Sequence, residues 1–222
     1  MTYLKFIIIT LITFLSFGLS LQARSTNKLA KIISNQGNIS ITEANKSKNS
    51  GTNNSQFSAE GALLSTRGAK SGLQVITSEG YRLYLGSNTE VSINYIDNKA
   101  QYTLHTGHMG IDAGRGSCTV QTTLSSVDIL KSFCDIELSK DEYGKEAQAT
   151  SCIDCSNGNV NIHTHDNEQI TSLQAGETAT CTQSEHITVS KTSVKKLSQI
   201  IENLGISFTN NVNDTLIVSP EA

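Results

Sequence analysis

Apolar and polar residues alternate with a period of two over most of the chain, from about residue 31 to residue 192. Gly and Asn interrupt the alternation at short intervals, which is typical of strands joined by tight turns. The pattern predicts an all-β fold built from antiparallel hairpins. Residues 46–56 contain no apolar side chain, so we expect a mobile surface loop there.

One hairpin can be predicted in register. If Asp97 and Asn98 form a two-residue loop, the apolar residues of the two flanking segments face one another and share one side of the sheet. The predicted cross-strand pairs are Tyr95 with Ala100, Ile93 with Tyr102, and Val91 with Leu104.

A second hairpin is expected around Asn157-Gly158, because this dipeptide suits the two positive φ angles of a type I′ turn. Its register places Cys155 opposite Val160 and Cys152 opposite His163. The two cysteines then point to opposite faces of the strand.

Helical spacing predicts one amphipathic helix near the C-terminus. Ser193 is its expected N-cap and Gly205 its expected stop, and two short strands are expected after it, at 206–208 and 215–218. The apolar positions of the helix are Val194, Leu197, Ile200, Ile201 and Leu204.

The N-terminal residues 1–23 have the parts of a secretory signal peptide. Lys5 precedes an apolar run at 6–19, and the small residue Ala23 stands before Arg24. The run is shorter than the about 20 residues of a membrane-spanning helix. We expect cleavage after Ala23, with retention as an anchor as the alternative, and a mature chain in the periplasm or secreted without a membrane span.

The first testable prediction is that the mature protein begins at Arg24. Edman sequencing of the protein purified from its native compartment gives the answer directly. An N-terminus at Met1 would contradict cleavage and would favour the anchor.

Composition argues against several functions. The formal net charge is −3 and no run of Lys or Arg is present, so nucleic acid and anionic membranes are not expected partners. No G-x-S-x-G motif occurs, and the carboxylate pairs Asp135/Glu137 and Asp141/Glu142 are interpreted as a solvated loop. We therefore expect no enzymatic activity and no cofactor.

The five cysteines are candidate disulfide or structural thiols, because a secreted chain meets an oxidising environment. Their odd number leaves at least one thiol free or bonded to another chain. Pairing cannot be read from the sequence. The candidates are Cys118, Cys134, Cys152, Cys155 and Cys181.

Cys152 and Cys155 form a CxxC motif, for which a redox dithiol and half of a zinc site are the chemical readings. His163 and His165 would complete the zinc site. The predicted hairpin separates the two thiols, so we favour separate structural roles and no metal site. His163 and His165 are then solvent-facing residues of a polar face, as are His105 and His108.

The order and spacing of several segments resemble the FecR domain, an all-β extracytoplasmic module. These segments are 37–41 (GNISI), 63–69 (LLSTRGA), 78–85 (SEGYRLYL), 104–109 (LHTGHM), 158–162 (GNVNI) and 173–177 (LQAGE). One stretch departs from the family pattern G-T-x-F-x-V: residues 131–136 read KSFCDI, so Lys131 stands at the position of the Gly. Residues 187–208 also resemble the start of an STN-type unit, and the resemblances divide the chain into 24–186 and 187–222.

The resemblance implies a FecR-like β-domain and a binding or regulatory role in the bacterial envelope. Signalling members of the family bind a sigma factor through a cytoplasmic N-terminal segment. Only a few residues precede the signal peptide here, so that mechanism is not expected. The predicted function is a non-enzymatic module that binds an unidentified envelope or secreted protein. The alternative is a surface adhesin or carbohydrate-binding module, although the absence of Trp weakens sugar binding.

Overall fold

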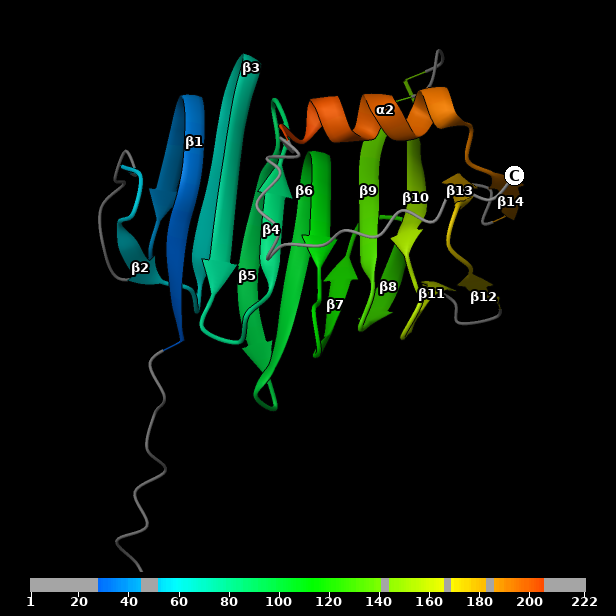
Figure 1. Ribbon diagram of the computed structural model, residues 1–222, viewed down its shortest axis with the longest axis horizontal. Helices are drawn as coiled ribbons and strands as arrows, with labels where there is room; N and C mark the ends of the chain where they lie inside the picture. The colour runs from blue at the N-terminus through cyan, green and yellow to red at the C-terminus, as the bar shows by residue number, and fades with distance from the viewer. Residues whose placement is uncertain (1–27, 45–51, 141–143, 166–168, 183–185, 206–222) are drawn as a thin grey trace, which may run out of the picture.

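The computed structural model describes residues 28–44, 52–140, 144–165, 169–182 and 186–205. The predicted signal peptide, the strands at 206–208 and 215–218, and the pair Asp141/Glu142 lie outside these ranges. Within them the chain forms one sheet of 14 strands and helix α2 (Figure 1). The elements are β1 (Leu29–Thr42), β2 (Gln56–Ser58), β3 (Ala62–Thr77), β4 (Arg82–Leu85), β5 (Glu90–Ile96), β6 (Lys99–Asp112), β7 (Ser117–Gln121), β8 (Ser125–Leu130), β9 (Phe133–Lys140), β10 (Glu146–Asp154), β11 (Asn159–Thr164), β12 (Ile170–Leu173), β13 (Glu177–Thr182), β14 (Ile187–Lys191) and α2 (Val194–Asn203). The predicted all-β fold is confirmed.

Three long strands, β1, β3 and β6, turn this sheet into two layers. The first half of β6 pairs with β5 and β7, whereas its second half pairs with β4 and β9. β3 divides in the same way, because its first part pairs with β5 and its last part pairs with β4. β1 pairs with both parts of β3 and therefore follows the same division. Layer one therefore contains β2, β4, β9, β10, β13 and β14, layer two contains β5, β7, β8, β11 and β12, and the long strands belong to both.

Each long strand changes layer at a glycine with positive φ: Gly37 in β1, Gly68 in β3 and Gly107 in β6. Gly107 shows why glycine is needed. Its φ is 91°, and a Cβ there would lie 2.5 Å from the hydroxyl of Thr89 and 2.6 Å from the carbonyl oxygen of Asn88. The corner of β6 thus combines a left-handed backbone with close approach of a neighbouring turn.

The core lies between the layers. The predicted β5–β6 hairpin is confirmed in register, with Tyr95 opposite Ala100, Ile93 opposite Tyr102 and Val91 opposite Leu104. Tyr102 is fully buried, and its ring meets that of Tyr81 edge-on at 6.5 Å.

The second predicted hairpin is wrong. β10 pairs with β9 and β13 in layer one, while β11 pairs with β8 and β12 in layer two. A turn is present at Asn157-Gly158, but neither residue has the positive φ of the predicted type I′ turn, and the turn carries the chain from one layer to the other. Both edges of β10 are occupied by strands from elsewhere in the chain, so no edge remains for β11.

Residues 52–56 of the expected surface loop have backbone partners. Residues 52–56 lie in the described part of the chain, where Ser55 accepts a hydrogen bond from the amide of Ile32 at 3.0 Å and Gln56 opens β2. Pairing to the edge of β1 gives this polar segment backbone partners without burying side chains. Residues 52–54 are exposed, as expected of a surface loop, whereas Gln56 belongs to a strand.

Helix α2 confirms the helical prediction. The hydroxyl of Ser193 caps it by accepting from the amide of Lys196 at 3.2 Å. The helix lies across β4, β6, β9 and β10 on the outer face of layer one (Figure 1). Ile200 and Leu204 pack there with Phe133, and Gly110 leaves room for Leu204 because a Cβ would meet its side chain at 2.5 Å. The described ranges hold no helix that combines the length and hydropathy needed to cross a bilayer.

Lys131, which stands at the position of the Gly in the pattern that residues 131–136 resemble, adopts a backbone conformation that favours glycine. Lys131 has a φ of 47°, a conformation that costs a non-glycine residue about 1–2 kcal/mol. Lys131→Gly is therefore expected to raise the free energy of unfolding by up to about 1 kcal/mol, since glycine loses more chain entropy on folding. Urea denaturation measures the change, and an unaltered or lower midpoint would contradict it.

A buried histidine–aspartate pair beneath helix α2

Strands β6 and β9 are neighbours in layer one, and their outward-facing side chains meet α2. In β9 the residues Cys134, Ile136 and Leu138 face the core, so Asp135 and Glu137 face outward. In β6, His108 is outward-facing and lies opposite Glu137, two residues along each strand from the pairing of Gly110 with Asp135. This diagonal brings His108 and Asp135 together.

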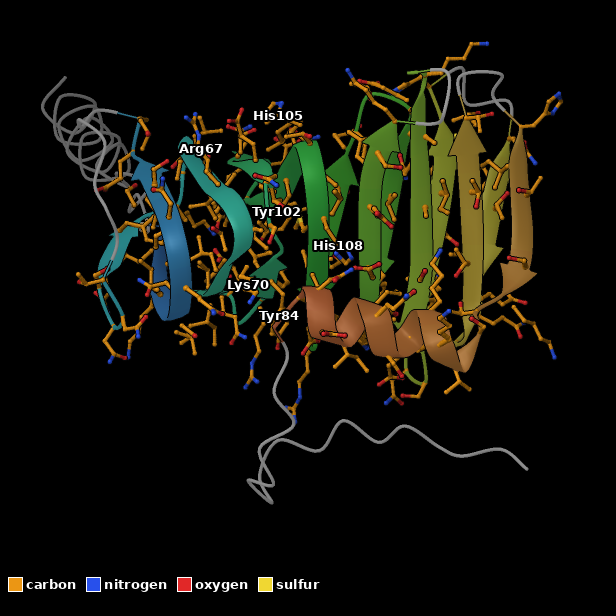
Figure 2. The ribbon with its side chains drawn as sticks, turned by 90° about the horizontal axis from the view of Figure 1, so that it is seen from above. Arg67, Lys70, Tyr84, Tyr102, His105 and His108 are labelled. Carbon is orange, nitrogen blue, oxygen red and sulfur yellow. A yellow bond between two sulfur atoms is a disulfide. The ribbon has the colours of Figure 1, made fainter. Side chains whose placement is uncertain are left out.

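The two side chains form a buried pair. His108 Nε2 is hydrogen-bonded to Asp135 Oδ1, and the residues are 8% and 2% exposed. The backbone of His108 is held by the β4–β5 turn: its amide donates to the Thr89 hydroxyl at 2.9 Å, and its carbonyl accepts from the Gly86 amide at 2.8 Å. Figure 2 shows His108 next to α2, whereas His105 lies away from the helix.

Burial and pairing act in opposite directions on these groups. Burial alone lowers the pKa of His108, but the hydrogen bond and negative charge of Asp135 outweigh it and raise that pKa. Burial raises the pKa of the Asp135 carboxyl, and the contact with His108 offsets only part of the increase. A charge on either group thus depends on its partner for compensation.

Two polar cavities border the pair. One of about 570 Å³ lies where the long strands turn and where α2 ends, and a second of about 430 Å³ follows the helix. His108 and Glu137 line both. The first is further lined by Lys70, Ser71, Ser87 and Glu202, and the second by Lys195, Lys196 and Gln199.

The order of side chains across the strands does not suit nucleophilic catalysis. On the outer face, Asp135 lies between His108 and Ser151, its register partner in β10. The Ser151 hydroxyl instead bonds the Thr178 hydroxyl at 2.9 Å. In a Ser–His–Asp triad the histidine stands between the other two. In the ranges that the structure describes, no three His, Cys, Asp or Glu side chains are grouped as a metal site. The arrangement is a buried polar contact that couples two strands beneath a helix.

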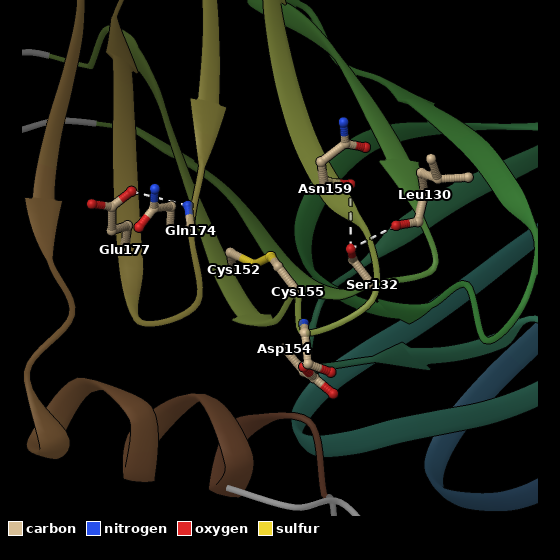
Figure 3. Close-up of a disulfide and its surroundings, with 9 residues drawn as sticks. Leu130, Ser132, Cys152, Asp154, Cys155, Asn159, Gln174 and Glu177 are labelled. Carbon is tan, nitrogen blue, oxygen red and sulfur yellow. Dashed lines mark hydrogen bonds between the residues drawn. A yellow bond between two sulfur atoms is a disulfide. The ribbon is translucent and has the colours of Figure 1, made fainter. Parts of the chain in front are cut away.

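Cys152 and Cys155 form a disulfide (Figure 3). This corrects the expectation that their side chains point apart. Strand β10 is irregular between Cys152 and Asp154 and ends there, so strict alternation no longer applies and Cys155 can turn back toward Cys152. The other cysteines, Cys118, Cys134 and Cys181, are buried and take no part in this disulfide.

The side chains of His163 and His165 have different partners and do not form a common site with Cys152. His163 lies on the outer face of layer two, where its Nε2 is 3.1 Å from Asp128 Oδ2. His165 Nε2 is 3.1 Å from the backbone oxygen of Thr122. Cys152 belongs to the other layer, so its expected position beside His163 is also wrong.

The sequence pattern does not predict the buried pair. The expectation of a solvated loop at Asp135 and Glu137 is wrong, because both belong to β9 and Asp135 is buried. The expectation that His108 faces solvent is also wrong, because it is 8% exposed. The period-two pattern of residues 133–138 (FCDIEL) shows a strand with Asp135 on its second face, but the helix that covers this face is distant in sequence.

Comparisons with known proteins find a likeness in fold. No protein-family model and no curated protein matches the chain. Two crystal structures titled "putative anti-sigma factor", from Parabacteroides distasonis, match with TM-scores of 0.51 and 0.50 and 16% sequence identity. Each match covers 61% of this chain and 62% of that chain, so the chain spans less than two thirds of these neighbours. At this identity, what the chain shares with them is the all-β fold.

Proposed function

We propose that the chain is a non-enzymatic, extracytoplasmic FecR-like module that binds a protein of the bacterial envelope or a secreted protein and has a regulatory role. The observation that carries the proposal is the all-β fold that the chain shares with the structures titled "putative anti-sigma factor". The sequence resemblance to the FecR domain and the secretory pattern at residues 1–23 support it independently.

The surface around α2 is the proposed recognition site. Here the polar cavities carry groups of both charges, with Lys70 and Lys195 beside Glu137 and Glu202. Val194, at the start of the helix, is 80% exposed. A mixed polar surface with an exposed apolar residue is suited to a transient protein partner.

Photo-crosslinking in intact cells tests this proposal. A photoreactive amino acid at Lys70 or Gln199 is expected to yield one discrete protein adduct. The same group at Lys99, in the β5–β6 hairpin away from α2, is the matched control and should not give that adduct. Equal adducts at all three positions, or none, would contradict the proposed site. Specific binding on a glycan array would favour the alternative, a carbohydrate-binding module.

A further inference from the structure

Cys152 has two partners with which it can form a disulfide. It is bonded to Cys155, three residues later. Its register partner across the β9–β10 pair is Cys134, which carries a free thiol. Both Cys134 and Cys152 are fully buried members of the same core cluster, so their side chains point to the same side of layer one.

The cross-strand alternative fits disulfide geometry. Residues directly opposite one another in an antiparallel pair have Cα atoms about 4.5–5.5 Å apart, within the range of about 4.4–6.8 Å found in disulfides. The Cα atoms of Cys152 and Cys155 are 6.6 Å apart, also within that range. Cys152 can therefore bond to either neighbour without movement of a whole strand.

The three cysteines of this group differ in solvent exposure. Cys134 and Cys152 are closed to solvent, whereas Cys155 is half-buried at the end of β10 and begins the turn toward β11. A disulfide that moved inward would leave its released thiol at the position that external reagents can reach.

We propose that Cys134, Cys152 and Cys155 form a thiol–disulfide exchange site, in which the bond moves from Cys152–Cys155 to Cys134–Cys152. The thiolate of Cys134 attacks Cys152 Sγ and forms the new bond. The Cys152–Cys155 bond breaks, its electron pair leaves with Cys155, and Cys155 takes up the proton that Cys134 lost. No external oxidant or reductant is consumed.

The exchange changes the shape of a surface pocket next to Cys155. A cavity of about 590 Å³ lies over the turn that follows Cys155, lined by Arg115, Lys131, Asp154, Ser156 and Asn157 among others. While Cys155 is bonded to Cys152, the beginning of this turn is tied to the core. After exchange the turn is released and β9 is tied to β10, so the state of the disulfide determines the shape of the pocket.

While Cys152 is bonded to Cys155, the buried Cys134 thiol is poorly reactive. Burial raises the pKa of the Cys134 thiol well above its ordinary value, and only a thiolate attacks a disulfide. We therefore expect exchange to be slow at neutral pH and faster at alkaline pH.

The decisive experiment uses the full mature chain with the substitution Cys155→Ser, oxidised under native conditions with glutathione disulfide. Cys134 and Cys152 transfer two electrons to glutathione disulfide, and peptide mapping is expected to show the Cys134–Cys152 bridge. A reduced protein, a glutathione adduct at Cys152, or a Cys118–Cys134 bridge would overturn the proposal. Cys118→Ser combined with Cys155→Ser is the matched control and should still form the Cys134–Cys152 bridge.

A second measurement keeps the wild-type chain. Incubation at alkaline pH, followed by N-ethylmaleimide and peptide mapping, is expected to show labelled Cys155 together with the Cys134–Cys152 peptide. Both products should be lost in Cys134→Ser. Labelled Cys155 in Cys134→Ser at the wild-type level would show that Cys155 is released by another route and would overturn the exchange.

Discussion

Replacement of His108 by alanine is expected to lower the free energy of unfolding by about 3–5 kcal/mol, because it leaves the Asp135 carboxylate buried without its partner. Asp135 is 2% exposed and contacts His108 Nε2 beneath α2. Urea denaturation at pH 7, followed by circular dichroism, measures the change.

Two further variants make this prediction specific. His105→Ala removes an exposed histidine that contacts Ser92 at 3.0 Å, and its effect should stay below about 1 kcal/mol. The double replacement of His108 and Asp135 by leucine removes both charges, so it should cost less than His108→Ala alone. A loss below about 1 kcal/mol in His108→Ala would contradict the burial of a charged pair.

The stability that His108 contributes should depend on pH in a defined direction. Because the pKa of His108 is raised in the folded protein, the protonated histidine contributes its full stability below its ordinary pKa of 6.5. That contribution is lost as the pH rises through the folded-state pKa. The difference in stability between wild type and His108→Ala should therefore decrease from neutral toward alkaline pH, and an increase would contradict the assignment.

Gly107→Ala is expected to lower the free energy of unfolding by about 2–5 kcal/mol, from left-handed strain and overpacking together. Gly107 has a φ of 91°, and its added Cβ would lie 2.6 Å from both the Asn88 oxygen and the Thr89 Cα. These are backbone atoms, so the clash cannot be relieved by a change of rotamer. Thermal and urea unfolding measure the loss.

Gly176→Ala separates the two causes. Gly176 has a φ of 78°, close to that of Gly107, but a Cβ there would meet no atom within 4 Å. Its cost should be limited to the backbone strain, about 1–2 kcal/mol. If the two alanine variants lose the same stability, the close approach at the corner of β6 does not contribute, and the account of this corner is wrong.

The elements that the sequence predicts well are those specified by nearby residues. The β5–β6 hairpin follows from a two-residue turn and alternation on both sides, so Val91 faces Leu104 as expected. Helix α2 follows from its 3.6-residue spacing and from the cap at Ser193. Such local signals act over a few residues and need no knowledge of the remaining chain.

What depends on partners distant in sequence could not be predicted. The turn at Asn157-Gly158 is local, but the pairing of β10 is decided by β9 and β13, which occupy both of its edges. The irregular end of β10 then brings Cys155 back to Cys152.

The buried pair shows the same division. By its alternation of apolar residues the sequence determines that β9 has a second, polar face that carries Asp135. Only the tertiary structure decides that the face is buried, because α2, more than 50 residues later, covers it and β6 supplies His108. Burial depends on what packs above a side chain, and this information is absent from the local pattern.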